Sequence, residues 1–295
     1  MIALQYILDA INIGGLYAMM ALGIGLIFGI MRLINFAHGE MVMAGGYAIG
    51  LLATLPTPLV IVLSLVFIIA LALLIEQCAF RPLRGQDPAT LLVASFAVSY
   101  FLQNLTVMIF GARPLPFTFA PGLADTIEVT GLRLRLPLLQ FVSLGLMIIA
   151  LAGVATLLKR TALGIQLRAA AEDVVTARLS GVKVNRVIAF AFVMSAVLAW
   201  IVSLIYSAQI GQLSPAMGVR PLIIGFVATI LGGLGSLSGA ALGGFVVGAI
   251  SVLLDAVLPA YLRPFREAFL FGLVFVILVV RPEGLLRVRA LQERV

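Results

Sequence analysis

The chain has 295 residues, of which 63% are hydrophobic and only 11% are charged. Soluble domains are about 45–50% apolar and about 25% charged, so this composition excludes a soluble globular protein and indicates an integral membrane protein. Cys78 is the only cysteine, which excludes an internal disulfide and a cysteine-based metal site. The formal net charge of +7 comes from basic residues in short connections, so it predicts membrane topology and no binding of nucleic acid.

Long apolar segments follow one another along almost the whole chain. A helix needs roughly 20 mainly apolar residues to cross the hydrocarbon of a bilayer, and backbone groups in lipid must be bonded within the helix. The segments run at 5–30, 40–55, 59–79, 89–110, 137–158, 188–210, 222–235, 239–257 and 267–280. Segment 222–235 is too short to span comfortably, which favours a re-entrant or broken helix. We predict an all-α, polytopic transmembrane bundle of eight or nine spans.

Basic residues in the loop 159–187 give the orientation of the bundle. Cytoplasmic loops are enriched in Lys and Arg, so this loop, with its polar island at 168–187, is predicted to be cytoplasmic. Counting back along the spans places loop 111–136 and the N-terminus outside. The basic tail at 281–294 also prefers the cytoplasm, which requires nine spans, or eight if segment 222–235 does not cross and the tail is an exception.

The polar island is expected to contain a short helix from Ala169 to Leu179. Glu172 and Asp173 lie near its start and Arg178 near its end, which matches the helix dipole. Gly181 is expected to stop it.

One face of this short helix would carry Ala170, Val174 and Ala177 at helical spacing. Such a small apolar ridge can seat in the groove of a partner protein. The alternative is a solvated basic loop that only sets orientation.

Asn35, His38 and Glu40 follow the first span. The simpler interpretation is that they cap the second helix or anchor it at the lipid headgroups. A functional interpretation places them at a gate, because histidine titrates near neutral pH.

A glycine cluster precedes and opens the segment at 239–257; its members are Gly232, Gly233, Gly235, Gly239, Gly243 and Gly244. Close helix packing through the G-x-x-x-G spacing is one interpretation. A turn between a broken and a full helix is another, and a substrate passage lined by backbone is the third. The cluster lacks the lysine and spacing of a phosphate-binding loop, so ATP hydrolysis is not assigned to this chain.

Acidic residues lie within or at the ends of apolar segments, at Asp9, Glu76, Asp255 and Glu267. We expect Glu76 to pair near Arg81 and Glu267 near Arg266 at helix ends, since an isolated charge in the bilayer is costly. Asn12 shares a helix face with Asp9. No catalytic triad, metal-ligand spacing or cofactor motif is present in the sequence, so neither an enzyme nor a cofactor is predicted.

Three sequence runs together resemble the LivH-type permease of branched-chain amino acid ABC importers. They are INFAHGEMVMAGGY at 34–47, ALGIQLRAAAEDVVTARLSGV at 162–182 and GGLGSLSGAALGG at 232–244. Within the second run, A-x-x-D before A-x-x-x-G resembles the coupling loop of ABC importer permeases.

The resemblance implies a single permease domain over 1–295, with a cytoplasmic coupling loop at 159–187, in the bacterial inner membrane. The implied residues that couple to an ATPase are Ala170, Glu172, Asp173, Ala177, Arg178 and Gly181. The candidate pathway or gate residues are Asn35, His38, Glu40, Gly232, Gly233, Gly235 and Gly239.

The same resemblance implies the partners and the substrate. Expected partners are a second, LivM-like permease, two ATP-binding subunits, a periplasmic substrate-binding protein and the lipid bilayer. The expected activity is import of branched-chain amino acids. Alternatives are a related permease for urea, amides or other small solutes, and, in a different class, a self-contained ion-coupled carrier.

Overall fold

The computed structural model describes residues 2–117, 119, 122, 126–129 and 134–286. Part of loop 111–136 and most of the basic tail at 281–294 therefore lie outside the described residues, as does residue 1.

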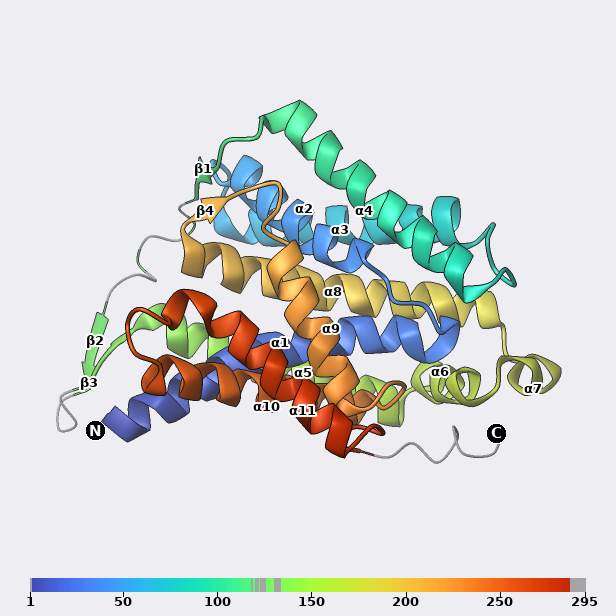
Figure 1. The fold of residues 1–295 in the computed structure, drawn as a ribbon. Coiled ribbons are helices and arrows are strands. Elements are labelled where there is room, and N and C mark those ends of the chain that lie inside the picture. Colours follow the sequence, from blue (N-terminus) through green and yellow to red (C-terminus); the bar gives the residue numbers. More distant parts are fainter. Residues whose placement is uncertain (1, 118, 120–121, 123–125, 130–133, 287–295) are drawn as a thin grey trace.

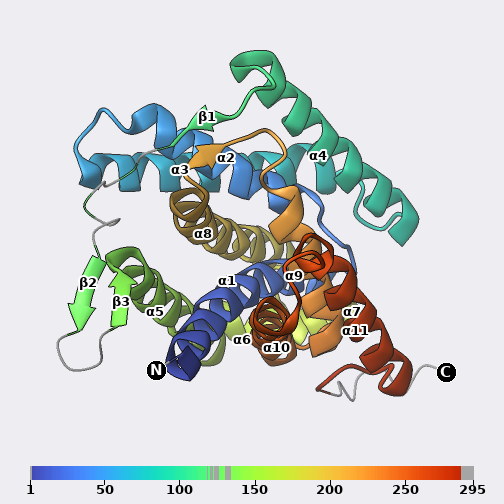
Figure 2. The same ribbon diagram turned by 60° about the vertical axis from the view of Figure 1, so that its left-hand side comes forward.

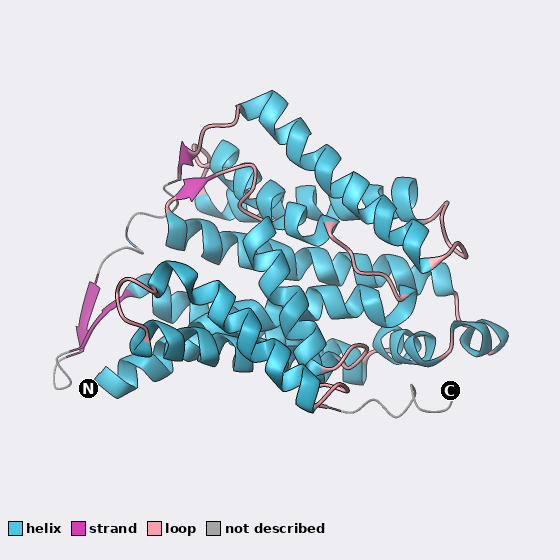
Figure 3. Cartoon of the chain, viewed as in Figure 1, coloured by secondary structure: helices cyan, strands magenta, loops and turns pink. Residues whose placement is uncertain are grey.

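Helices make up most of the described chain, and the few strands are short (Figure 3). The α-helices are α1 (Ile2–Met31), α2 (Ala37–Leu52), α3 (Thr57–Ile75), α4 (Pro88–Phe110), α5 (Leu138–Arg160), α6 (Ala162–Glu172), α7 (Val174–Leu179), α8 (Val184–Ile210), α9 (Val219–Gly232), α10 (Leu237–Val257) and α11 (Arg266–Val280). A π-helical turn, Glu76–Phe80, extends α3, and a 3-10 turn, Arg263–Phe265, precedes α11.

Two small antiparallel sheets lie in the connections between helices. Strand β1 (Leu115–Pro116) pairs with β4 (Gln212–Leu213), so the connections after α4 and after α8 are joined. Strand β2 (Thr126–Val129) pairs with β3 (Leu134–Pro137), with Thr126 opposite Pro137.

Six helical stretches among the described residues are long and apolar enough to cross a membrane. They are Leu4–Met31, Thr57–Phe80, Pro88–Phe110, Leu138–Arg160, Val184–Ile210 and Leu237–Val257. Each of the predicted apolar segments coincides with a helix, but α2, α9 and α11 are shorter than this criterion. The protein is therefore an all-α, multi-pass membrane protein.

The bundle has two distinct ends (Figure 1). We call the end with the strands and the start of α1 the strand end, and the end with α6 and α7 the α6 end. Hydrogen bonds join the start of α1 to the start of α5, from Asn12 to Ser143 at 2.7 Å and from Gln140 to Asp9 at 2.8 Å. The chain after α11 returns to the end of α9, where Leu285 N–H donates to the Leu231 carbonyl.

Helix α1 lies in the centre of the bundle, with α5, α8, α9 and α10 around it (Figure 2). Its packing against α10 depends on glycine: a Cβ at Gly244 would lie 2.3 Å from Ala18 Cα, and one at Gly248 2.3 Å from Gly14 Cα. Small residues let helix backbones approach closely in a membrane. Helix α4, by contrast, exposes most of its surface, as expected for a helix facing lipid or another subunit.

Candidate functional site

Two short helices begin inside the bundle and not at its surface. The start of α2 meets the start of α9, where a Cβ at Gly39 would lie 2.7 Å from the Gly218 carbonyl oxygen and a Cβ at Gly218 1.9 Å from the Gly39 carbonyl oxygen. Only glycine permits this approach of two backbones.

From this meeting point the two helices run in opposite directions (Figure 1). The last turns of α2 reach the strand end, where Gly50 faces Leu213 and Phe117. Helix α9 reaches the α6 end, where Leu286 N–H donates to the Gly232 carbonyl. At 1.5 Å per residue they are roughly 24 and 21 Å long, less than the roughly 30 Å of hydrocarbon, so non-helical chain completes each crossing. The sequence predicted a broken helix at 222–235 but not at α2.

The polar residues at the start of α2 are buried and bonded to three different helices or segments. The Asn35 side-chain oxygen accepts from Ala37 N–H at 3.1 Å. The His38 Nδ1 lies 2.9 Å from Ser195 Oγ on α8. The hydroxyl of Ser99, on α4, donates to Glu40 Oε1 at 2.8 Å. These bonds fix the start of α2 against α4 and α8.

Asn35 thus bonds the first N–H of α2, although the N-cap position itself is Phe36, and the expectation for His38 and Glu40 is corrected. Both are 0% exposed, so neither side chain lies at the headgroups, and neither caps the helix. The His38 ring instead occupies the space left by Gly23 on α1, where a Cβ would lie 2.4 Å from Cε1. A gating role for these residues remains a prediction.

The glycine cluster serves both packing and turning. A Cβ at Gly232 would lie 2.0 Å from the Gly239 carbonyl oxygen, and one at Gly243 2.0 Å from the Ala228 carbonyl oxygen, so α9 and α10 touch through their backbones. Gly233 and Gly235 have φ of +107° and +92° and form the turn between the helices. The packing and turn interpretations are therefore both confirmed, and the passage interpretation stays a prediction.

The polar island contains two helices and not the single one predicted over 169–179. Helix α6 ends at Glu172, and Asp173 then caps α7 by accepting from Val175 N–H at 2.8 Å and from the Thr176 hydroxyl at 2.6 Å. An aspartate that bonds the backbone ahead of it favours a helix start over a helix interior.

The apolar ridge of Ala170, Val174 and Ala177, predicted to dock on a partner, faces the bundle and not the surface. Ala170 and Ala177 are 1% and 5% exposed and pack in the protein's own core, because small residues are what the close approach of this segment to the bundle requires. The exposed surface of α7 is formed by Val175, Thr176, Arg178 and Leu179 instead.

Glu172 is exposed at the end of α6. Gly181 has φ +85° just after α7, which confirms it as the stop of this helix. Docking of this segment on an ATPase stays a prediction.

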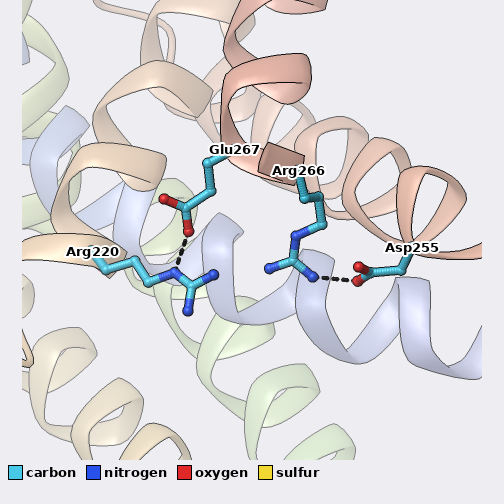
Figure 4. Close-up of polar contacts among 4 residues, drawn as sticks. All are labelled: Arg220, Asp255, Arg266 and Glu267. Carbon is cyan, nitrogen blue, oxygen red and sulfur yellow. Dashed lines mark hydrogen bonds and ion pairs between the residues drawn. The ribbon is translucent and has the colours of Figure 1, made fainter. Parts of the chain in front are cut away.

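The acidic residues at the helix ends form ion pairs with other arginines than those predicted. Arg220 pairs with Glu267 and Arg266 pairs with Asp255 (Figure 4), so the Glu267–Arg266 expectation is wrong. Adjacent residues on a helix point in different directions, which leaves Glu267 facing α9 and Arg266 facing α10.

Glu76 is likewise paired with Arg84 and not with Arg81. The Arg84 guanidinium also donates to Asn185 Oδ1 at the start of α8.

The sequence alone did not indicate the partners of the buried His38 and Glu40. Ser99 is one of two serines in α4, Ser195 is one of three in α8, and Gly23 is one of several glycines in α1. Nothing local distinguishes them, because their role arises only where α1, α4 and α8 surround α2. Among the described residues, no group of three or more His, Cys, Asp or Glu side chains could hold a metal ion.

The family profile described as "Branched-chain amino acid transport system / permease component" matches residues 6–279. The chain belongs to this family. One similar protein is the high-affinity branched-chain amino acid transport system permease protein BraD of Pseudomonas aeruginosa. The two sequences are 32% identical over 96% of this chain and 95% of the length of BraD. The corresponding LivH of Escherichia coli K12 is 29% identical over 96% and 95%.

Permeases named for other solutes also match this chain. The ribose import permease protein RbsC of Haemophilus influenzae is 25% identical over 75% of this chain and 69% of its own length. No solved structure matches.

Proposed function

We propose that this protein is the permease subunit of an ABC importer that moves branched-chain amino acids into the cytoplasm. Family membership supports the class, and the names of BraD and LivH support the substrate. The observation that carries the proposal is the meeting of α2 and α9 inside the bundle. Interrupted transmembrane helices that meet near the middle of the bilayer are the usual site at which transporters bind and pass a solute.

The topology we infer has nine crossings, with the α6 end in the cytoplasm of a bacterial cell. Non-helical residues before α2 and before α9 complete these two crossings, and α11 makes the last one. Basic residues at the α6 end are Arg32, Arg81, Arg84, Lys159, Arg160, Arg168, Arg178, Lys183 and Arg186. The excess of Lys and Arg there supports the orientation.

Residues 1–295 would form one permease domain, and residues 159–187 its coupling loop. We infer that α7 docks on one of two separate ATP-binding subunits through its exposed residues, with Asp173 and Gly181 fixing the start and the end of the helix. Movement of α7 would then reach the bundle through Ala170 and Ala177, which pack in its core. A second, LivM-like permease and a periplasmic binding protein complete the proposed importer.

The exposed leucine of α7 provides the test. Leu179 is 84% exposed, so Leu179→Asp should leave the fold intact and disrupt an apolar contact with an ATPase. We expect ATP-dependent uptake of leucine by the reconstituted importer to fall at least roughly tenfold, the size expected for a contact of about 1.4 kcal/mol or more.

Tyr261→Asp is the matched control, since Tyr261 is 75% exposed in the connection between α10 and α11, away from α6 and α7. Normal uptake by Leu179→Asp would reject the coupling role. Uptake without any ATPase would favour an ion-coupled carrier, and a preference for urea, amides or ribose over leucine, isoleucine and valine would reject the proposed substrate.

A further inference from the structure

A cavity of about 730 Å³ opens between α1, α5, α6 and α10. Its volume falls within the roughly 300–1,000 Å³ typical of pockets that enclose organic molecules. The apolar wall includes Leu22, Leu26, Val154, Leu158, Leu167 and Phe245. Gly25 and Gly29 of α1 also line it and leave space where other residues would project a side chain.

Basic side chains line the same cavity at the α6 end. They are Arg32 just after α1, Lys159 at the end of α5 and Arg168 on α6, with Glu172 as the acid among the lining residues. Within the described part of the chain, none of these three cations forms an ion pair. The lining therefore carries an excess of positive charge beside an apolar interior.

The backbone holds Arg32 in an uncommon conformation. Its φ of +53° is rare for a residue with a side chain. Such a conformation persists only where the surroundings impose it, and here it lies where the chain leaves α1 for the non-helical segment before α2.

Helix α5, which forms one wall of the cavity, is largely exposed. Ile148 and Ile149 of α5 are 61% and 70% exposed, so this helix presents an apolar face outward from the bundle. In a membrane such a face is covered by lipid chains, which can enter an adjoining apolar cavity.

We propose that the cavity binds an anionic phospholipid from the leaflet at the α6 end. Its phosphate would lie among Arg32, Lys159 and Arg168, and an acyl chain would extend along the apolar wall. Basic residues near a bilayer surface attract anionic lipids, and pockets between transmembrane helices with such residues bind their headgroups. A lipid bound there contacts α6 together with α1 and α10, and so stabilises the attachment of the polar island to the bundle.

The test measures lipid retention by the purified full-length protein, independently of transport. The protein is equilibrated in mixed micelles with equal amounts of phosphatidylglycerol and phosphatidylcholine, and bound lipid is counted by native mass spectrometry. We expect phosphatidylglycerol to be retained in preference. The variant Lys159→Gln/Arg168→Gln should reduce this preference roughly twenty-five-fold, because each basic residue near the lipid contributes about a factor of five.

Two further variants separate the cavity from general surface charge. Arg178→Gln/Arg186→Gln removes the same charge from exposed positions outside the cavity and should leave the preference unchanged. Ala155→Trp fills the cavity from its exposed side and should reduce retention of lipid. Equal retention of both lipids, or an undiminished preference in Lys159→Gln/Arg168→Gln, would overturn the proposal. The proposal would also be overturned if the cysteine of Ala155→Cys formed a cross-link to a second permease, which would show that protein and not lipid covers the cavity.

Discussion

At the scale of single residues, the start of α2 is set by complementary large and small side chains. The His38 ring is fully buried and enters the space that Gly23 leaves on α1, while Ser195 holds its Nδ1. A protein interior packed at this density has no room for an added methyl group. The pair therefore fixes the depth at which α2 begins.

Gly23→Ala should destabilise the protein although alanine is the better helix former. The added Cβ would meet the His38 ring at 2.4 Å, and overpacking of this kind costs about 1–3 kcal/mol. Thermal unfolding of the purified protein should show a lower midpoint. Gly25→Ala is the control two residues further along α1, where a Cβ would make an ordinary 3.4 Å contact with Ala240. Equal midpoints for the two variants would contradict this account.

At the scale of elements, the break between α6 and α7 decides which residues reach the surface. Asp173 ends one helix and begins the next, and the resulting change of direction turns Val175 and Leu179 outward while Ala170 and Ala177 stay in the core. A continuous helix over 169–179 would have kept one uninterrupted face toward the bundle.

Asp173→Ala should loosen α7 by removing the oxygens that accept from Val175 N–H and the Thr176 hydroxyl. Loss of such a cap costs about 0.5–2 kcal/mol. Amide hydrogen exchange over 174–179 should become faster by roughly the corresponding factor of two to thirty. Asp173→Asn keeps a capping oxygen and should exchange nearly as slowly as the parent protein. Unchanged exchange in Asp173→Ala would show that the cap does not hold α7.

At the scale of the whole molecule, opposite ends of the bundle should lie on opposite sides of the membrane. Leu179 belongs to the α6 end, and Tyr261 to the connection between α10 and α11, which lies away from it (Figure 1). The positive-inside rule places Leu179 in the cytoplasm.

Single-cysteine labelling checks this topology in intact cells. With the native cysteine removed as Cys78→Ser, Leu179→Cys should resist a membrane-impermeant maleimide until the cells are opened. Tyr261→Cys should react in intact cells. Both side chains are well exposed, so the two positions differ only in the side of the membrane on which they lie. Labelling of Leu179→Cys in intact cells would reverse the orientation, and labelling of both would contradict nine crossings.

The sequence alone determined the class of protein, the positions of the apolar helices, the stop at Gly181 and the resemblance to LivH-type permeases. These features depend only on residues close together in the sequence: a membrane span is recognised from the hydropathy of about 20 neighbouring residues, and a helix stop from the conformation of one residue. The tertiary structure alone decided that Ala170 faces inward and that His38 is buried. It also decided that Glu267 pairs with Arg220, and that α2 and α9 meet at Gly39 and Gly218. Each of these depends on which helices lie side by side, and a partner 47 residues or more away leaves no trace in the spacing of either segment.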